Sequence, residues 1–111
     1  MKELPPPVTT GVLYTHFTTV YKLADEQAEK MIASAAKSIK EVFLSGEDAL
    51  GRGDMAGLAV FAHSLKGLLL NMGQMEWADI ARELEQAAKE GGAVDFKEMI
   101  GNLKDGVRDL L

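Results

Sequence analysis

The chain has 111 residues, a formal net charge of −5, and a composition that is 47% hydrophobic and 26% charged. This length and composition fit one compact domain and exclude general disorder. The absence of cysteine excludes disulfides, thiolate zinc sites and cysteine nucleophiles, and the acidic balance argues against nucleic acid as the main partner. No run of 18 apolar residues is present, so we expect no membrane span. The lack of cysteine is compatible with a reducing setting, and we expect a cytoplasmic location.

Three consecutive prolines, Pro5 to Pro7, exclude a helix or a central strand at the start of the chain. Residues 1–10 are therefore expected to form an extended arm or the end of an interdomain linker. No proline follows, and alanine, leucine, lysine and glutamate are abundant, so residues 11–111 are expected to be helical.

The spacing of apolar residues predicts five helices, at 12–23, 25–50, 55–71, 75–90 and 94–110. The second helix is expected to loosen at Ser45-Gly46 and to break at Gly51-Arg52-Gly53-Asp54, where Asp54 is a good N-cap. Gly73 and Gly91-Gly92 are expected to end the third and fourth helices, and Gly101 and Gly106 to weaken the last. The prediction is an all-α fold, an antiparallel four-helix bundle with an additional N-terminal helix.

His63 stands out in the third predicted helix because it points away from the apolar face. With about 100° per residue and His63 at 0°, the large apolar side chains gather near about 200°. These side chains are those of Leu58, Phe61, Leu65, Leu68, Leu69 and Met72. A buried structural histidine does not fit this wheel, whereas an ordinary surface histidine does.

Two neighbours of His63 favour a functional reading. Lys66 lies one turn further on, where its charge can neutralise an anion carried by the imidazole. Gly67 also lies on this face, although glycine costs about 0.5–1 kcal/mol relative to alanine inside a helix. The missing side chain leaves room for a partner to approach the ring.

The run Ala62-His63-Ser64-Leu65-Lys66-Gly67, with Gly73 six residues later and Leu84-Glu85 in the next helix, resembles the histidine-containing phosphotransfer (HPt) domain family. The resemblance implies a helical bundle in a two-component phosphorelay. His63 would accept a phosphoryl group from a receiver-domain aspartate, on Nε2, and pass it to another receiver. Lys66 would stabilise the phosphoryl charge and Gly67 would give access.

The resemblance further implies response-regulator receivers, and a sensor or hybrid histidine kinase, as partners. The Mg²⁺ and the acidic pocket would belong to the receiver, so no metal or other cofactor is expected in this chain. No P-loop or kinase nucleotide-binding motif is present, so we expect a phosphocarrier without ATP-dependent kinase activity of its own. The expected state is a monomer that binds neither nucleic acid nor membrane.

The chain departs from the family pattern after Gly67, where Leu68-Leu69-Leu70 replaces small or polar residues. The helical wheel places Val60, Leu70 and Gln74 on the His63 side, so these residues are candidates for docking a receiver. A tolerated surface leucine, or one that narrows access, is the alternative for Leu70.

Other features receive simpler interpretations. Trp77 is expected to be a core anchor, and His16 lacks the further ligands that a metal site needs. Glu83, Glu85 and Glu90, alternating with Arg82 and Lys89, are typical of a solvated helix face. Two alternatives to the phosphocarrier remain open, namely a non-transferring helical module that binds receivers or kinases, and a segment of a larger histidine kinase.

Overall fold

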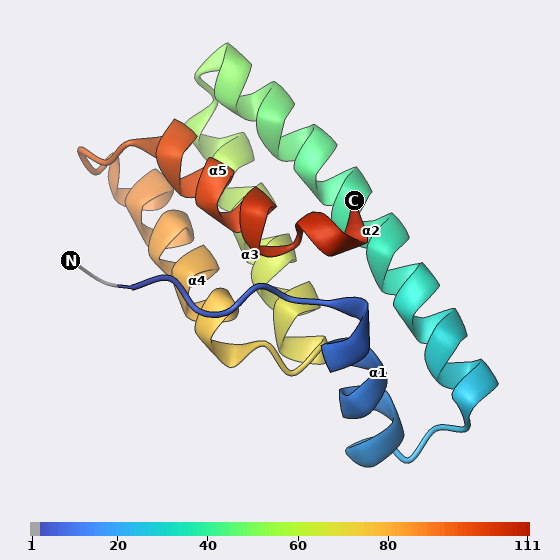
Figure 1. Cartoon of the computed structure of the whole chain (residues 1–111). Coiled ribbons are helices and arrows are strands. Elements are labelled where there is room, and N and C mark those ends of the chain that lie inside the picture. The colour runs from blue at the N-terminus through green and yellow to red at the C-terminus, as the bar shows by residue number, and fades with distance from the viewer. Residues whose placement is uncertain (1–2) are drawn as a thin grey trace.

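The computed structural model describes residues 3–111 and confirms the all-α prediction: the chain forms an antiparallel four-helix bundle with an additional N-terminal helix (Figure 1). The helices are α1 (Thr10–Thr19), α2 (Asp25–Arg52), α3 (Met55–Asn71), α4 (Met75–Glu90) and α5 (Phe96–Gly106), followed by the 3₁₀ turn η1 (Arg108–Leu110). None of these helices in the described part of the chain is both long enough and apolar enough to cross a bilayer.

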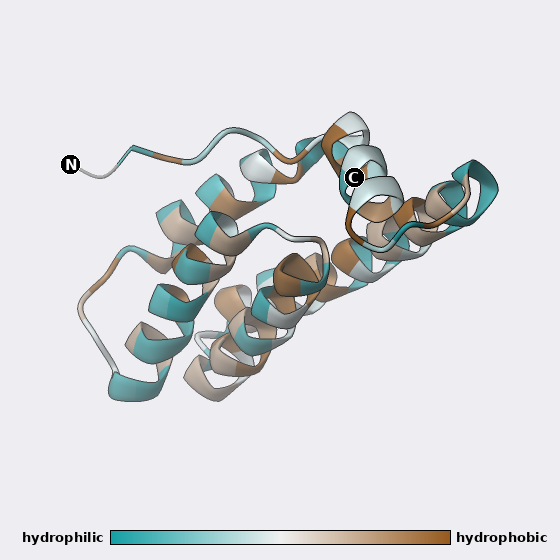
Figure 2. Ribbon diagram, turned by 90° about the horizontal axis from the view of Figure 1, so that it is seen from below, coloured by the Kyte–Doolittle hydropathy of each residue, from teal (hydrophilic) through white to brown (hydrophobic). Residues whose placement is uncertain are grey.

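Helix α3 lies at the centre of the fold, between α4 and α2, with which it makes its most extensive contacts. Its buried side chains join those of the other helices in one apolar core. Figure 2 shows hydrophobic and hydrophilic residues alternating around the helices, as amphipathic helices of a bundle require. The arrangement leaves one narrow face of α3 exposed between its two neighbours.

Helix α2 is continuous, so the predicted loosening at Ser45-Gly46 is wrong. Gly46 is buried, and a Cβ atom there would lie 2.5 Å from a ring carbon of Phe61 in α3. The glycine therefore admits an aromatic ring against the helix, which is a packing requirement and not a break. The helix also continues past the predicted end at Leu50 to Arg52, and Gly53 ends it with a left-handed φ of 63°.

Helices α3 and α4 have the predicted bounds, whereas those of the first and last helices differ by a few residues. Helix α1 begins at Thr10 because the Thr9 hydroxyl accepts a hydrogen bond from the Val12 amide, and it ends at Thr19 instead of residue 23. Asp54 caps α3 as predicted, since its carboxylate accepts the Gly57 amide at 2.9 Å. The last helix is shorter than the predicted 94–110 range, because α5 ends at Gly106 and the chain tightens into η1.

Residues 3–9, which precede α1, form an extended segment that packs against the bundle, and residues 1–2 of the predicted arm lie outside the described residues. It runs as the dark-blue segment across α4 in Figure 1, and Figure 2 shows it along one side of the helices. The Val8 side chain is fully buried, and the Val8 amide donates to the Gly106 carbonyl at 2.7 Å. The Thr10 amide donates to the Asp109 carboxylate, which joins the start of α1 to the end of the chain.

Candidate functional site

The structure places His63 on the exposed face of α3, as the helical wheel predicts. Its side chain is 67% exposed. The predicted core side chains of α3 are buried, with one exception: Leu58, Phe61, Leu65, Leu69 and Met72 are buried, whereas Leu68 is half-buried at the edge facing α2. The alanines that flank this face, Ala59 and Ala62, are buried as well, so His63 stands over a closely packed helix.

Glu85 of α4 corrects one sequence interpretation. Instead of belonging to a solvated face, Glu85 is only 5% exposed. It lies within the buried stripe of α4 that also contains Ala78, Ala81, Leu84 and Ala88. A carboxylate at helical spacing inside an apolar stripe is the signal that would have identified it, because a buried charge requires partners.

Glu85 holds the imidazole of His63 in one orientation. Its Oε2 lies 3.1 Å from Nδ1 of His63. An ionised carboxylate only accepts hydrogen bonds, so we assign the ring proton to Nδ1. The lone pair of the neutral ring is then on Nε2. This is the nitrogen that the exposed position of His63 leaves for a reacting partner.

Two lysines complete the charge balance around Glu85. Nζ of Lys66 lies 3.1 Å from Oε1, and Nζ of Lys89 lies 2.8 Å from Oε2. The hydrogen bond from Lys89, together with the hydrogen bond and the charge of Lys66, lowers the pKa of Glu85 to about 2, although burial opposes the shift. Glu85 is therefore a carboxylate at neutral pH, and it gathers both cations beside His63.

Sequence reasoning missed the role of Lys89. It treated this lysine as part of a solvated face, and Lys89 is indeed 62% exposed. However, Lys89 lies one turn beyond Glu85 on α4, which is the spacing at which helical side chains pair. The site thus consists of His63 and Lys66 from α3 and of Glu85 and Lys89 from α4.

The surface around the imidazole is open. A Cβ atom built on Gly67 would meet nothing within 4 Å. On the other side of the ring, a shallow hollow of about 310 Å³ is lined by Ala59, Val60, His63, Ser64, Glu85 and Lys89. The structure therefore brings Val60, which is 67% exposed, next to the histidine.

A larger groove of about 650 Å³ lies between α2 and α3 and continues this surface. Val60 and Ser64 line both the groove and the hollow at His63.

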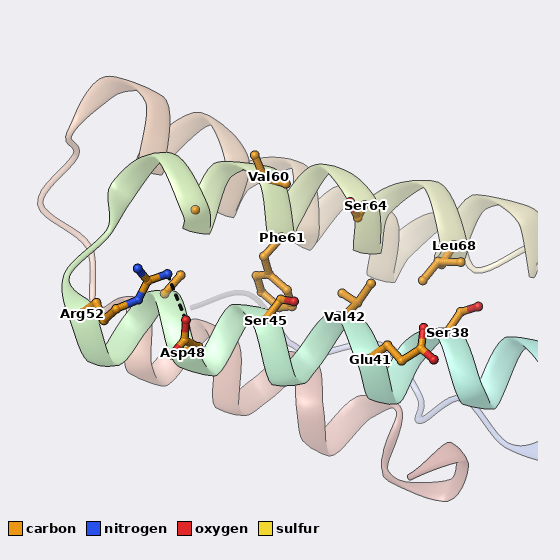
Figure 3. Close-up of a pocket in the computed structure, with 12 residues that line it drawn as sticks. Ser38, Glu41, Val42, Ser45, Asp48, Arg52, Val60, Phe61, Ser64 and Leu68 are labelled. Atoms are coloured by element: carbon orange, nitrogen blue, oxygen red, sulfur yellow. Dashed lines mark ion pairs between the residues drawn. The ribbon is translucent and has the colours of Figure 1, made fainter.

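Figure 3 shows Phe61 directed toward α2, with Val42 and Leu68 beside the same groove. At one end, Arg52 pairs with Asp48 at 2.9 Å. Small side chains such as Ser38, Ser45 and Ser64 leave this space open.

The other two predicted docking residues lie further from the imidazole. Leu70 is exposed on α3, two turns beyond His63, or about 10 Å along the helix axis. Gln74 lies beyond the end of α3, where its side chain donates to the Met72 carbonyl. It lines a cavity next to Pro5, Pro6 and Pro7. The helical wheel of α3 therefore does not apply to Gln74.

The two remaining sequence candidates, Trp77 and His16, both pack against other parts of the chain. Trp77 is buried, as expected of a core anchor. His16 packs over Gly73 in the turn between α3 and α4, and its ring meets that of Tyr21 edge-on. Within residues 3–111, no group of three histidine or acidic side chains has an arrangement that could hold a metal ion.

Comparison with known proteins identifies the family. The family model described as the Hpt domain matches residues 25–111, which include all four residues of the site. Searches of curated proteins and of solved structures find no match. Together with the helical bundle, this match shows that the chain belongs to the Hpt domain family, whose members are phosphotransfer modules of two-component signalling.

Proposed function

We propose that His63 accepts a phosphoryl group from the aspartyl phosphate of a receiver domain and passes it to the aspartate of another receiver. The observation that carries this proposal is the hydrogen bond between Nδ1 of His63 and the buried carboxylate of Glu85. It supplies a histidine whose exposed nitrogen is the unprotonated one, which is the state that a nucleophile requires.

In this reaction the Nε2 lone pair of His63 attacks phosphorus, and the bond from phosphorus to the aspartyl oxygen breaks. The bonding electrons leave with the receiver's carboxylate, and the proton on Nδ1 stays where it is. The phosphorylated ring gains positive charge, which the carboxylate of Glu85 stabilises through the Nδ1 hydrogen bond. In the reverse direction the ring leaves as neutral imidazole, so the same contact serves uptake and release.

Lys66 and Lys89 supply the charge that the phosphoryl group requires. A phosphoryl group adds about −1.5 to −2 charges. Both ammonium groups are held at Glu85, beside the ring, before any phosphate arrives. Phosphoryl transfer depends mainly on positioning and on electrostatic stabilisation. A small exposed site of this kind can therefore suffice, and the phosphocarrier needs no cofactor of its own.

The receiver would dock over the exposed face of α3. Val60 is the contact with the strongest support, since it borders both His63 and the groove between α2 and α3. Leu70 would extend the contact along α3, and Gln74 stays a more distant candidate. Gly67 would lie beneath the receiver's active site, where its open surroundings permit close approach.

The proposal is tested by incubating the chain with a phosphorylated receiver and following acid-labile label. Label is expected on wild-type protein and not on a His63→Gln variant. Label that persists in the variant would refute the assignment of His63. A variant that is not labelled but still binds the receiver separates the two steps. By contrast, receiver binding without labelling of the wild type would favour the alternative of a non-transferring interaction module.

A further inference from the structure

The described part of the N-terminal arm before α1, residues 3–8, contacts the bundle through backbone hydrogen bonds and one buried side chain. Trp77 of α4 donates its indole N–H to the Pro6 carbonyl at 2.8 Å. Two residues later, the Val8 amide donates to the Gly106 carbonyl of α5, and the Val8 side chain is fully buried. Pro6 itself is exposed. The arm is therefore held by its backbone and by one apolar anchor.

The sequence of the arm suits this mode of contact. Consecutive prolines favour the polyproline II conformation, which makes no internal hydrogen bonds and leaves its carbonyls free to accept. Grooves lined by aromatic residues recognise such segments, because the preformed conformation loses little entropy on binding. Pro5, Pro6 and Pro7 provide the segment, and the indole of Trp77 provides an aromatic donor.

The indole ring of Trp77 packs closely against α5. A Cβ atom on Gly106 would lie 2.5 Å from two carbons of the indole ring, so only glycine admits the ring at this point of α5. A cavity of about 440 Å³ lies beside the three prolines, with Val12, Met75 and Trp77 among its other lining residues.

Helix α1 is held by contacts that do not involve residues 3–8. Leu13 and Phe17 are buried in the core, and the Thr10 amide is bonded to Asp109. The Thr9 hydroxyl caps the helix by accepting the Val12 amide. Departure of residues 3–8 would take the Val8 side chain out of the core but would break none of these contacts of α1. Residues 3–8 also precede the region matched by the family model, which begins at residue 25.

We propose that the groove formed by Trp77 and Gly106 is a binding site for extended, proline-rich peptides, and that the chain's own arm occupies it as a displaceable ligand. A proline-rich segment of another chain binds in the same place when the arm leaves. Occupancy by the arm lowers the apparent affinity for such a segment, because only the fraction of molecules with a free groove can bind it.

Trp77 is the only tryptophan of the chain, so its fluorescence reports directly on the groove. The experiment uses the full chain with Val8→Ser, which removes the buried anchor, and a synthetic peptide of residues 1–9 as the probe. The emission of this variant is expected to shift to the red relative to wild type. Added peptide is expected to reverse the shift, and to bind the variant at least tenfold more tightly than wild type.

Leu4→Ser is the matched control, because Leu4 belongs to the same arm but is half exposed. Its emission and peptide affinity should equal those of wild type. A control peptide with alanine at positions 5–7 should bind the Val8→Ser variant more weakly. Unchanged emission in Val8→Ser, or emission that the probe peptide does not restore, would overturn the proposal.

Hydrogen exchange on the wild-type chain provides the second measurement. If the arm is displaceable, the Val8 amide and the Trp77 indole N–H exchange at least tenfold faster than the slowest amides of α3. If they exchange at the rate of global unfolding, or if Val8→Ser abolishes the helical circular dichroism signal, the arm is part of the cooperative core and the proposal fails.

Discussion

The carboxylate of Glu85 lies 3.1 Å from Nδ1 of His63, although the two residues are 22 positions apart in the sequence. This contact joins α3 to α4 through Nδ1. It leaves the other ring nitrogen, Nε2, for the proposed phosphoryl transfer. It also holds a buried carboxylate between one imidazole and two ammonium groups. The site is thus an ordered cluster of four side chains, and single substitutions within it have distinguishable effects.

Glu85→Gln tests the orientation of the imidazole. The amide at this position cannot stabilise positive charge on the ring, so we expect phosphoryl uptake by His63 to fall roughly 10- to 100-fold, below the usual range for loss of a direct proton-transfer group. Nitrogen-15 NMR of His63 should also show a smaller population with the proton on Nδ1. Glu90→Gln, an exposed substitution on the same helix, should change neither quantity. An unaltered tautomer in Glu85→Gln would contradict the proposed role.

The stability of the protein should depend on the ionisation of Glu85 at acidic pH. The pKa of Glu85 is lowered to about 2 in the folded state, from an ordinary value of 4.5. The unfolded chain therefore binds this proton first, and the contribution of Glu85 is complete above about pH 4.5 and lost as the pH falls toward 2. Urea unfolding of wild type and Glu85→Gln should show a stability difference that shrinks over this interval. A difference that is constant with pH would exclude this linkage.

Lys66→Ala and Lys89→Ala test the two cations separately. Removing Lys66 should reduce the rate of transfer or the lifetime of phosphorylated His63 by about tenfold. This factor corresponds to a loss of about 1.4 kcal/mol of charge stabilisation. Lys89 is more exposed than Lys66 and should have a smaller effect. Transfer is measured with purified phosphorylated receiver, and Lys37→Ala on the exposed surface of α2 is the control. Equal rates in all four proteins would remove the lysines from the mechanism.

Gly67→Gln separates access from stability. Glutamine is the better helix former, so the fold should gain roughly 0.5 kcal/mol, while the added side chain should obstruct the receiver and slow transfer. Gly101→Gln in α5 is a matched control, since that glycine also lies inside a helix with open space around it. It should give a similar gain in unfolding free energy with normal transfer. If both variants transferred at the wild-type rate, the access argument would be wrong.

Two glycines of α2 should respond to alanine in opposite directions. At Gly46 the new methyl group would collide with the Phe61 ring, so we expect Gly46→Ala to lose about 1–3 kcal/mol of stability. At Gly51 the space is open, and alanine should raise stability by up to about 1 kcal/mol. Thermal and urea unfolding measure both changes. A stabilised Gly46→Ala variant would show that the ring moves aside freely.

The sequence by itself determined the helices and the exposed face of α3. Helical periodicity is a local property, and apolar residues three and four positions apart specify which side of a helix is buried. The outward position of His63, the cap at Asp54 and the core position of Trp77 follow from such local patterns. The family motif carried the assignment of His63 further, because its residues also lie within a short stretch of chain.

The tertiary structure alone decided which residues meet. In the sequence, Glu85 is one of several acidic residues of α4. Only the packing of α4 against α3 buries it beside His63. Gly46 reads as a helix breaker until Phe61 is placed against it. The sequence of the arm likewise does not indicate its contact with α4, where the Trp77 indole donates to the Pro6 carbonyl. In each case the partner is distant in the sequence. The energy of burying a charge, fitting a ring or pairing a carbonyl is defined only once the helices have packed.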